Sequence, residues 1–358
     1  MNSVTLLQET AIPERVGARA AQRIADVASV FAEDMTFVEA ELARAARSGV
    51  APATDAGVHL LEAGGKRVRP LTVLLAASCF GTVSATAREL SVVAELVHLA
   101  TLLHDDVVDD GMERRGHPAA RRVWGNAVSV LAGDLLLTHA LERTAKAVGG
   151  PPPGPTEVRG GGAGSAVSLV DLIATLRRLV DGEIVQLRSR SRLDLEEGTY
   201  FRVVRDKTAS LFGWAARVGA RSAGASEQAA SLLGVFGEHV GIAFQLVDDC
   251  LDYAGDPEET GKTLLADLHE GKVTLPLIRA VTGGFGRVED VERAKLGDGD
   301  ACLQLAHAVR SSGACEAVRE IARDHTARAL SALHETAPPT AARELLGAVA
   351  RELTGRTK

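Results

Sequence analysis

Two aspartate clusters stand at the ends of long apolar segments in this chain. HDDVVDD follows VAELVHLATLL, and QLVDDCLDY overlaps the end of VGIAFQLV. Both clusters contain the pattern D-D-x-x-D, and their aspartates are Asp105, Asp106, Asp109 and Asp110 in the first and Asp248, Asp249 and Asp252 in the second. Unpaired carboxylates beside buried helix faces are costly, so a strongly positive partner is expected. Hard oxygen ligands suit Mg²⁺, usually with a phosphate-bearing substrate completing its shell.

The interior of the protein has to be built mainly from aliphatic side chains. Apolar residues make up 46% of the sequence and aromatic residues only 3%, so Ala, Leu and Val dominate. This composition favours packed helices. The formal net charge of −7 and the scarcity of aromatic residues argue against a nucleic-acid-binding protein.

Apolar residues recur with the period of an α-helix in five segments, which are 18–46, 87–104, 127–148, 167–187 and 231–251. No comparable pattern indicates strands, so we expect an all-α protein. From about Gly283 onward, further amphipathic helices follow without a chemical motif. Because the chain shows no strong internal boundary, residues 1–358 are expected to form a single domain.

The segment 149–165 interrupts the helical pattern. Its sequence, GGPPPGPTEVRGGGAGS, contains seven Gly and four Pro in seventeen residues, which prevents a continuous helix. We expect a Gly/Pro-rich loop inserted at the surface. A linker between two domains is the alternative, but helices on both sides are expected to contribute to one site.

The cysteines and the N-terminus indicate a soluble protein of a reducing cytoplasm. The four cysteines are scattered without a C-x-x-C pair, which argues against a zinc site or a disulfide framework. The first residues, MNSVTLLQETAIPERVG, lack the features of a signal peptide, and no apolar stretch reaches the roughly 20 residues of a membrane span. An apolar product would still predict peripheral contact with a membrane.

In each cluster, two aspartates are spaced so that they lie on the same face of a helix. Positions four apart on a helix differ by about 40° of rotation, so Asp105 and Asp109 share a face, as do Asp248 and Asp252. His98 lies two turns before Asp105 on the same stripe, and Gln245 lies two turns before Asp252. A solvated helix end is the simple alternative for one cluster, but two clusters with the same spacing favour a metal site. Neither cluster has the D-x-D-x-D-G pattern of an EF-hand.

Basic groups accompany the aspartates. GGKRVRP contains Lys66, Arg67 and Arg69, and MERRGHP contains Arg114 and Arg115. Such side chains bind phosphate oxygens, and the adjacent glycines permit a close backbone approach. The segment GDPEETGKT resembles a phosphate-binding P-loop, but its spacing is one residue too long and an apolar helix, not a strand, precedes it. We therefore exclude a P-loop nucleotidase.

Taken together, these segments resemble the trans-polyprenyl diphosphate synthase family, long-chain type. The resemblance extends from about residue 60 to residue 280. It is carried, in family order, by GGKRVRP, ELVHLATLLHDDVVDDGMERRGHPAARRVWGNAVSVLAGDLLL, GEIVQL, RDKTASLF, AFQLVDDCLDY and DLHEGKVTLPLI. The resemblance implies an isoprenoid-synthase-type bundle of antiparallel helices around a central cavity, and a homodimer.

The resemblance also implies roles for individual residues. Three aspartates coordinate Mg²⁺, with three ions expected when substrate is bound: Asp105, Asp109 and Asp248. Three neighbours support that shell: Asp106, Asp249 and Asp252. Isopentenyl diphosphate is bound by Lys66, Arg67, His98 and Arg115. The allylic diphosphate is bound by Arg114, Lys207, Thr208, Gln245 and Lys262, with Lys272 as a further basic group near the diphosphates. Catalysis is assigned to Asp105, Asp109, Lys207, Thr208, Gln245 and Asp248.

The chemistry implied by the family is one that these residue types can support. Metal ions and basic side chains neutralise a departing diphosphate, so that an allylic cation forms and is attacked by the double bond of isopentenyl diphosphate. The residues four and five positions before the first aspartate often form the floor of the product tunnel in this family. Here they are Thr101 and Ala100, which are small, and they predict a long all-trans product such as a quinone side-chain precursor.

Three alternative functions remain open at the level of sequence. The chain could be a short-chain geranylgeranyl or farnesyl diphosphate synthase. It could be a terpene cyclase, although cyclases commonly carry an N-S-E-type second motif where this chain has DDCLD. It could also be a non-catalytic subunit of a heteromeric synthase, although both aspartate clusters are intact.

Overall fold

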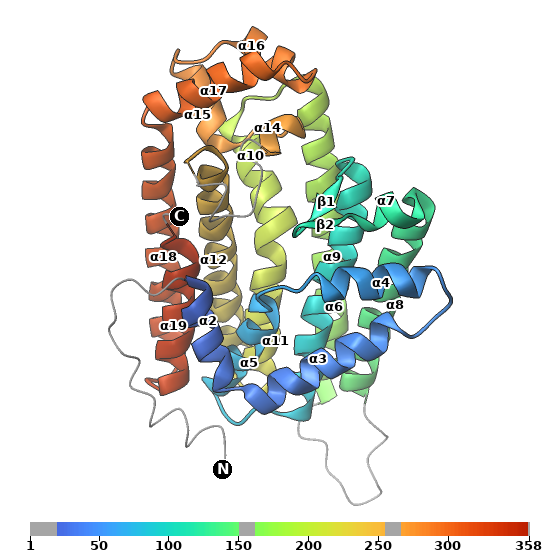
Figure 1. Ribbon diagram of the computed structural model, residues 1–358. Helices are drawn as coiled ribbons and strands as arrows, with labels where there is room; N and C mark the ends of the chain where they lie inside the picture. Colours follow the sequence, from blue (N-terminus) through green and yellow to red (C-terminus); the bar gives the residue numbers. More distant parts are fainter. Residues whose placement is uncertain (1–19, 150–161, 255–265, 357–358) are drawn as a thin grey trace, which may run out of the picture. The chain divides into compact units, whose positions relative to one another are not determined.

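The computed structural model describes residues 20–149, 162–254 and 266–356 (Figure 1). Nearly all of these residues are helical, so the predicted all-α class is confirmed. The elements of the first half are α2 (Ala20–Ser29), α3 (Ala32–Ala46), α4 (Ala53–Glu62), α5 (Val68–Ser78), α6 (Ala85–Val108), β1 (Glu113–Arg114), β2 (His117–Pro118), α7 (Ala120–Trp124), α8 (Asn126–Gly149) and α9 (Gly162–Arg192). Those of the second half are α10 (Glu197–Val203), the π-helix η1 (Val204–Ala209), α11 (Ser210–Ser222), α12 (Glu227–Ala254), α14 (Ala266–His269), α15 (Leu275–Thr282), α16 (Val288–Lys295), α17 (Gly299–Ser311), α18 (Ala314–Thr336) and α19 (Ala341–Thr354).

The chain divides into two compact units. Unit 1 comprises Met1–Thr175, Phe212–Val235 and Ala332–Val349, and unit 2 comprises Leu176–Leu211, Phe236–Ser331 and Ala350–Lys358. The chain passes from one unit to the other within α9, α11, α12, α18 and α19. The single domain expected for residues 1–358 stays a prediction.

Two predicted boundaries were wrong. The helix expected over 18–46 is interrupted at Val30 and Phe31, where the backbone makes i→i−3 hydrogen bonds and Phe31 leaves the helical region. Both side chains are buried, and apolar periodicity cannot distinguish such a turn from continuous helix. The loop expected over 149–165 is too long, because α8 includes Gly149 and α9 begins at Gly162. Residues 150–161 lie outside the described part of the chain. Each glycine costs a helix only about 1 kcal/mol, which neighbouring helical turns offset.

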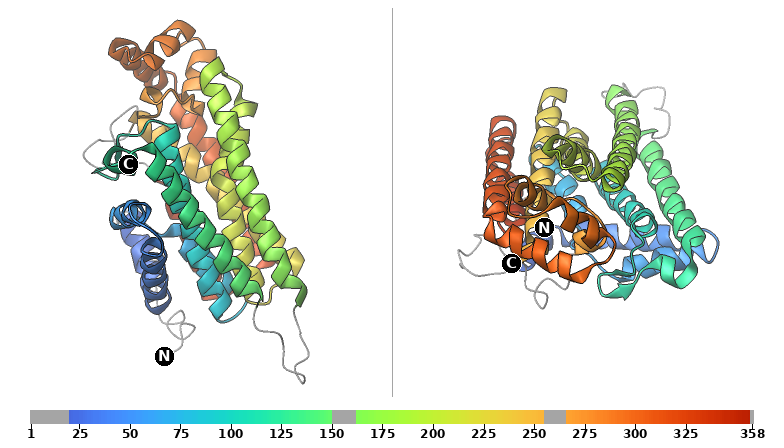
Figure 2. Two further views of the ribbon diagram at one scale, coloured as in Figure 1. Left: turned by 90° about the vertical axis from the view of Figure 1, so that its right-hand side faces the viewer. Right: turned by 90° about the horizontal axis from the view of Figure 1, so that it is seen from above.

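Unit 1 is organised around α6. This helix begins at Ser84, whose side chain accepts a hydrogen bond from the backbone N–H of Ala87, and it packs most extensively against α8 (Figure 2). Helices α3 and α5 also contact it. Its interior positions are fully buried, including Val92, Val93, Leu96 and Val97. The long apolar segment before the first aspartates is therefore a core helix with its carboxylates at its C-terminal end.

Unit 2 is organised around the second half of α12. Leu246, Val247 and Cys250 of α12 pack in one cluster with Tyr200 of α10 and Ile278 of α15. A second cluster joins Tyr253 of α12 with apolar residues of α14 to α17. The helices from α14 onward thus help to bury the apolar face of α12.

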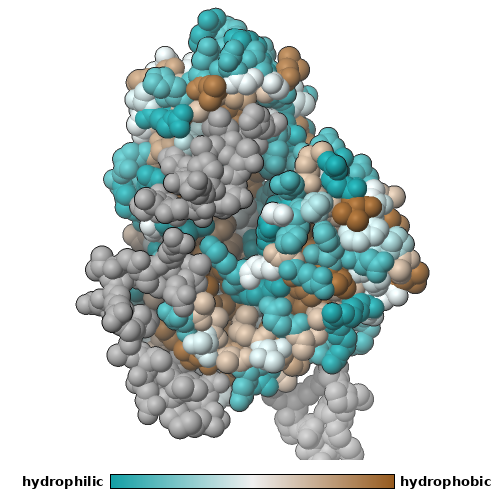
Figure 3. Space-filling model, viewed as in Figure 1, coloured by the Kyte–Doolittle hydropathy of each residue, from teal (hydrophilic) through white to brown (hydrophobic). Residues whose placement is uncertain are grey.

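Helix α12 is also the one described helix that is long and apolar enough to cross a membrane, over Glu227–Tyr253. Most of its apolar window is buried inside the protein, as expected for a core helix. The surface over α3, α4 and α7 is mainly hydrophilic with separate hydrophobic side chains (Figure 3). Such scattered exposed apolar groups are usual on soluble proteins.

A histidine pair in unit 2 predicts a pH-dependent stability. His239 Nδ1 and His325 Nδ1 are 2.8 Å apart, so one ring has to donate and the other has to accept. Burial lowers the pKa of both side chains, to about 4 for His325, where His239 and Arg328 add to the effect and Asp324 opposes it. Arg205 also opposes protonation of both rings, and Glu238 favours protonation of His239.

The pKa values of both histidines are lower in the folded protein than in the unfolded chain. Below about pH 6.5 the unfolded chain therefore binds more protons than the folded protein, and the free energy of unfolding decreases as the pH falls. We expect the free energy of unfolding to fall by roughly 1 kcal/mol between pH 7 and pH 5 through this pair. Denaturant titrations of the wild type and of His325→Gln should show a weaker pH dependence in the variant. An equal dependence in both proteins would exclude this source.

Candidate active site

The first aspartate cluster occupies the last turn of α6. The backbone N–H of Asp109 donates to the carbonyl of Asp105 at 2.8 Å, so these two residues keep the helical phase predicted from their spacing. Asp110 then adopts a left-handed conformation with φ of 54°, and the N–H of Gly111 donates to the carbonyl of Asp106 at 2.8 Å. This arrangement is a Schellman motif, which ends a helix. It holds Asp105 and Asp109 together at the helix terminus.

Asp106 links this cluster to the basic segment that follows. Arg114, in the β1–β2 hairpin, donates to Asp106 Oδ1 from Nε at 2.9 Å and from Nη2 at 2.5 Å. Burial raises the pKa of Asp106, although Arg114 opposes the shift. Asp106 Oδ2 is buried without a hydrogen-bond partner. Asp106 thus positions Arg114, and its role in supporting a metal shell stays a prediction.

Arg67 is held by two carboxylates. It stands in the left-handed region at the start of α5, with φ of 47°, and its side chain is only 7% exposed. Its guanidinium donates to Glu39 Oε1 at 2.7 Å and to Glu95 Oε1 at 3.1 Å. A Cβ at Gly65 would lie 2.8 Å from Arg115 Nη1 and 2.9 Å from Arg67 Nη1, so Gly65 permits the close approach of both arginines.

His98 faces this group of arginines. Burial lowers its pKa well below the ordinary value, and four arginines add to the effect: Arg69, Arg115, Arg114 and Arg67. The imidazole is therefore neutral at pH 7 and can donate from one nitrogen and accept at the other. Arg69 also packs over the ring of Phe212, with 4.7 Å from its guanidinium carbon to the ring centroid. Unit 1 therefore carries a concentrated positive group suited to a diphosphate.

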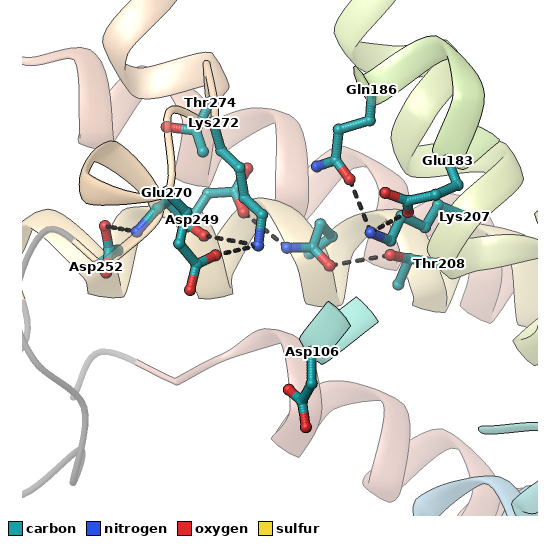
Figure 4. Close-up of polar contacts among 12 residues, drawn as sticks. Asp106, Glu183, Gln186, Lys207, Thr208, Asp249, Asp252, Glu270, Lys272 and Thr274 are labelled. Atoms are coloured by element: carbon teal, nitrogen blue, oxygen red, sulfur yellow. Dashed lines mark hydrogen bonds and ion pairs between the residues drawn. The ribbon is translucent and has the colours of Figure 1, made fainter. Parts of the chain in front are cut away.

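Lys207 and Thr208 lie in the π-helix η1 of unit 2, and π-helical turns are frequent at functional sites. Lys207 Nζ donates to Gln186 Oε1 at 2.7 Å and forms an ion pair with Glu183 (Figure 4). Both partners come from the α9 segment GEIVQL. The predicted catalytic lysine is thus held between a carboxylate and an amide.

Gly182, which precedes Glu183, controls how closely α9 approaches η1. A Cβ at Gly182 would lie 2.7 Å from the backbone nitrogen of Lys207, closer than real Cβ contacts allow. We expect Gly182→Ala to displace Lys207 and to lower kcat by roughly 10- to 100-fold, since a shift of about 1 Å can cost that much. Gly198→Ala is the matched control, because a Cβ there meets nothing within 4 Å. Steady-state kinetics and melting curves of both variants check this prediction, which an active Gly182→Ala enzyme would contradict.

Thr208 begins a continuous chain of hydrogen bonds in unit 2. Its hydroxyl donates to Gln245 Oε1 at 3.0 Å, and Gln245 Nε2 donates to Asp249 Oδ1 at 2.7 Å (Figure 4). The hydroxyl of Tyr200 donates to Asp249 Oδ2 at 2.6 Å. Burial raises the pKa of Asp249, and Asp267 adds to the shift. Asp249 therefore serves to orient Gln245, which in turn orients Thr208.

The other two aspartates of the second cluster have different surroundings. Asp248 is partly exposed, and its Oδ1 lies 4.0 Å from Nη2 of Arg356 near the C-terminus. Arg356 packs over the ring of Phe244 at 4.6 Å from the centroid. Asp252 is buried, and its Oδ2 accepts a hydrogen bond from the backbone N–H of Asp267 at 3.3 Å. Among these three aspartates, Asp248 is the one that is partly exposed, and its role as a metal ligand stays a prediction.

Of the remaining predicted cations, Lys66 and Arg115 are in unit 1 and Lys272 is in unit 2. Lys272 Nζ donates to Glu270 Oε2 at 2.5 Å and lies 3.9 Å from Asp267 Oδ1. Lys66 and Arg115 are exposed residues of unit 1. Lys262 lies outside the described residues. The structure therefore places the aspartates and cations of the first motif together in unit 1, and those of the second motif together in unit 2.

Comparison with known proteins identifies the family. Residues 52–308 match the sequence model of the polyprenyl synthetase family. The all-trans-nonaprenyl-diphosphate synthase (geranyl-diphosphate specific) of Rhodobacter capsulatus is 34% identical over 324 residues, which cover 90% of this chain and 94% of the relative. The octaprenyl diphosphate synthase of Escherichia coli (strain K12) is 34% identical over 318 residues, covering 88% of this chain and 93% of the relative. The chain belongs to the polyprenyl synthetase family.

A solved structure supports the same conclusion for the fold. The crystal structure of polyprenyl synthase from Caulobacter crescentus CB15, complexed with calcium and isoprenyl diphosphate, matches with a TM-score of 0.83 at 34% identity. The match covers 97% of this chain and 100% of that one. The predicted resemblance to trans-polyprenyl diphosphate synthases of the long-chain type is confirmed. As a member of this family, the chain is a prenyltransferase that uses isopentenyl diphosphate and an allylic diphosphate.

The predicted metal ligands are carboxylate oxygens, the hard donors that suit Mg²⁺. Among residues 20–149, 162–254 and 266–356, no group of three or more His, Cys, Asp or Glu side chains is placed to hold a metal ion by itself. Asp105 and Asp109 are in unit 1, and Asp248 is in unit 2. Their role as Mg²⁺ ligands stays a prediction.

Sequence reasoning missed the residues that position the predicted ones. They are Glu39, Glu95, Glu183, Gln186, Tyr200, Glu270 and Arg356. Four of them carried a signal, because Glu95, Glu183, Gln186 and Glu270 stand in segments on which the resemblance rested. Glu39, Tyr200 and Arg356 stand outside those segments.

Proposed function

We propose that this protein condenses isopentenyl diphosphate with an allylic diphosphate by Mg²⁺-assisted ionisation and makes a long all-trans polyprenyl diphosphate. One observation carries the proposal: in unit 1, an aspartate pair at the end of α6 accompanies a separate group of arginines around a neutral histidine. Such an arrangement suits a reaction with two diphosphates, one bound through metal ions and one bound directly.

Asp105, Asp109 and Asp248 would hold the metal ions, three of them with substrate bound. When bound, Mg²⁺ supplies positive charge that neutralises the departing diphosphate. Arg114, fixed by Asp106, would bind oxygens of the allylic diphosphate together with Lys262 and Lys272. Because Arg114 is already oriented by its two hydrogen bonds to Asp106 Oδ1, little conformational freedom is lost when a phosphate binds.

Arg67, Arg115, Lys66 and His98 would bind isopentenyl diphosphate. His98 is suited to donate a hydrogen bond without adding another charge. Arg67 is buried between two carboxylates, so part of its contribution is to keep the loop of Gly64 and Gly65 in place, as its contact of 3.4 Å with the carbonyl of Gly64 indicates.

Lys207, Thr208 and Gln245 would face the allylic cation. Lys207 is paired with Glu183, so its role is electrostatic and it does not act as a base. Thr208 and Gln245 present oxygen dipoles whose directions are set by Asp249 and Tyr200. The proton lost in the last step passes to the released diphosphate.

A product assay tests this proposal. The purified chain is incubated with isopentenyl diphosphate, Mg²⁺ and, in separate reactions, geranyl, farnesyl or geranylgeranyl diphosphate. Long polyprenyl diphosphates that disappear when EDTA is added are expected. Accumulation of only fifteen- or twenty-carbon products would instead identify a short-chain synthase. Hydrocarbon formed without isopentenyl diphosphate would identify a cyclase, and inactivity of the chain alone would identify a subunit of a heteromeric enzyme.

A homodimer is part of the proposal. Helix α9 carries five exposed apolar side chains, which are Val170, Ile173, Val180, Ile184 and Leu187. Their spacing places them within an arc of about 100° on the helix. An apolar stripe of this kind, which the exposed Arg177 interrupts, is expected to be covered, and a second copy of the same chain would present a matching surface.

Analytical ultracentrifugation tests the dimer. Wild-type protein is expected to sediment as a dimer, Ile184→Lys as a monomer, and the conservative Ile184→Val as a dimer.

We further propose that the protein is cytoplasmic and that it contacts a membrane peripherally to release its apolar product. Flotation with lipid vesicles in the presence of substrates checks that contact.

A further inference from the structure

Two of the four cysteines lie beside each other in unit 2. Cys250 is in α12, between Asp249 and Leu251 of the second aspartate cluster, and its side chain is fully buried. Cys315 is in the first turn of α18 and is partly exposed. Cys250 Sγ donates to the carbonyl oxygen of Cys315 at 3.5 Å, and the Cys315 side chain packs against the apolar cluster that contains Cys250.

The surroundings of Cys315 favour its thiolate. The neighbouring Cys250 side chain lowers the pKa of Cys315, and Arg319 and Arg310 add to the effect while burial and Glu316 oppose it. Its position at the N-terminus of α18 also stabilises a negative charge. A thiolate that is partly exposed and stands next to a second, buried thiol is the arrangement of an oxidisable cysteine with a resolving partner.

We propose that Cys250 and Cys315 form an intramolecular disulfide when the protein meets a peroxide, and that this modification lowers the synthase activity. The Cys315 thiol first loses its proton to the solvent. The resulting thiolate attacks one peroxide oxygen, the O–O bond breaks, and the leaving hydroxide takes a proton back from the solvent to become water. Cys315 is then a sulfenic acid. The Cys250 sulfur attacks the Cys315 sulfur, the S–O bond breaks as the S–S bond forms, and the departing hydroxide takes the Cys250 proton. Two thiols and one peroxide thus become one disulfide and two waters.

The effect on activity follows from the position of Cys250. A covalent bond is shorter than a hydrogen-bonded contact, so its formation draws α12 and α18 together at this point. Asp248, Asp249 and Asp252 are on the same two turns of α12 as Cys250. Because Asp249 orients Gln245 through a hydrogen bond of 2.7 Å, a local shift of α12 disturbs the proposed catalytic group directly. This consequence rests on the proposed function.

The other two cysteines provide a contrast within the same protein. Cys79 and Cys302 are buried at 2% exposure each, and burial raises the pKa of both thiols, to about 12 for Cys79. They should therefore resist the same oxidant.

Peptide mapping of the full chain tests the modification itself. The protein is treated with a few equivalents of hydrogen peroxide, its remaining thiols are blocked, and it is digested without reduction. We expect a cross-linked peptide pair containing Cys250 and Cys315 and the loss of two hydrogens from the intact mass. A disulfide to Cys79 or Cys302, or oxidation of Cys315 to sulfinic acid without a cross-link, would overturn the proposal. This readout does not depend on activity, so it is separate from the proposed function.

Activity measurements test the consequence. Oxidation is expected to lower kcat of the wild type by roughly tenfold, with recovery after dithiothreitol, because a displacement near 1 Å has an effect of that order. Cys315→Ser should keep its activity before and after peroxide, whereas the matched control Cys302→Ser should respond like the wild type. Equal sensitivity of Cys315→Ser and the wild type would overturn the link between the disulfide and activity. Cys315→Ala serves as a second variant if the serine disturbs folding.

Discussion

Replacement of Asp105 or Asp248 by asparagine is expected to lower kcat/KM by about three orders of magnitude, or about 4 kcal/mol of transition-state stabilisation. Each substitution keeps the size of the side chain and removes the negative charge that would bind Mg²⁺. Both carboxylates are partly exposed, so the folded structure should tolerate the change. Steady-state kinetics over a range of Mg²⁺ concentrations measure the effect.

Asp110→Asn is the matched control for these variants. Asp110 belongs to the same cluster as Asp105, but its side chain is 83% exposed and it pairs with Arg121 at 2.9 Å. It stands beyond the end of α6, where it adopts the left-handed conformation that asparagine also tolerates. Its variant should keep nearly full activity. If Asp105→Asn and Asp110→Asn lost activity equally, the charge of the whole segment would matter and the specific assignment of Asp105 would be wrong.

Asp248→Asn is also expected to lower the stability of the folded protein, and this effect is separate from the loss of metal binding. Nη2 of Arg356 lies 4.0 Å from Asp248 Oδ1 and is buried without a hydrogen-bond partner. Asp248→Asn removes the carboxylate charge and so leaves the Arg356 guanidinium without this nearby anion. A moderate fall in melting temperature is therefore expected for this variant. Arg356→Gln tests the same contact from the other side, because it should change stability without the thousandfold loss in kcat/KM.

Replacement of Ala100 by phenylalanine is expected to shorten the product, because the resemblance places the floor of the product tunnel at this position. Ala100 is on α6, five residues or about 7 Å before Asp105, and its side chain is 1% exposed. An aromatic ring at this buried position would occupy space that a growing chain needs. Chromatography of the dephosphorylated products measures the chain length.

Two further variants make the product-length prediction decisive. Ala100→Ser barely changes the volume and should leave the product distribution as it is. Thr101→Phe is an alternative if the buried Ala100→Phe protein is unstable, because overpacking of a core costs typically 1–3 kcal/mol. Thr101 is only partly buried, and its hydroxyl donates to the carbonyl of His98 at 2.8 Å. Stable variants at both positions with unchanged long products would show that the tunnel does not pass these residues.

The helical part of the fold was largely predictable from sequence. The segment expected over 87–104 is α6, the one over 127–148 is α8, and the one over 231–251 is α12. These helices are long and strongly periodic, so the hydrophobic pattern identifies them. The turn at Val30 and Phe31 was not predictable, because a tight turn between two packed helices preserves the apolar spacing. The β1–β2 hairpin was not predictable either, since each strand has only two residues.

The residues of the candidate site could be predicted from the sequence, but the hydrogen-bond and ion-pair partners that hold them could not. The D-D-x-x-D spacing was enough to place Asp105 and Asp109 on one face, since both belong to one helix. By contrast, Arg67 and Glu95 are 28 residues apart, and Tyr200 and Asp249 are 49 residues apart. Contacts between such distant residues depend on how helices pack, which local pattern does not encode.

By itself, the sequence determined the all-helical class, the family and the two aspartate clusters, because these rest on periodicity and on short motifs within single helices. Only the tertiary structure decided which groups are held in place and by what. It showed that Asp106 orients Arg114, that Glu183 and Gln186 hold Lys207, and that Cys250 meets Cys315. The physical reason is that hydrogen bonds and ion pairs act over about 3 Å, so they are settled only when helices from different parts of the chain have packed.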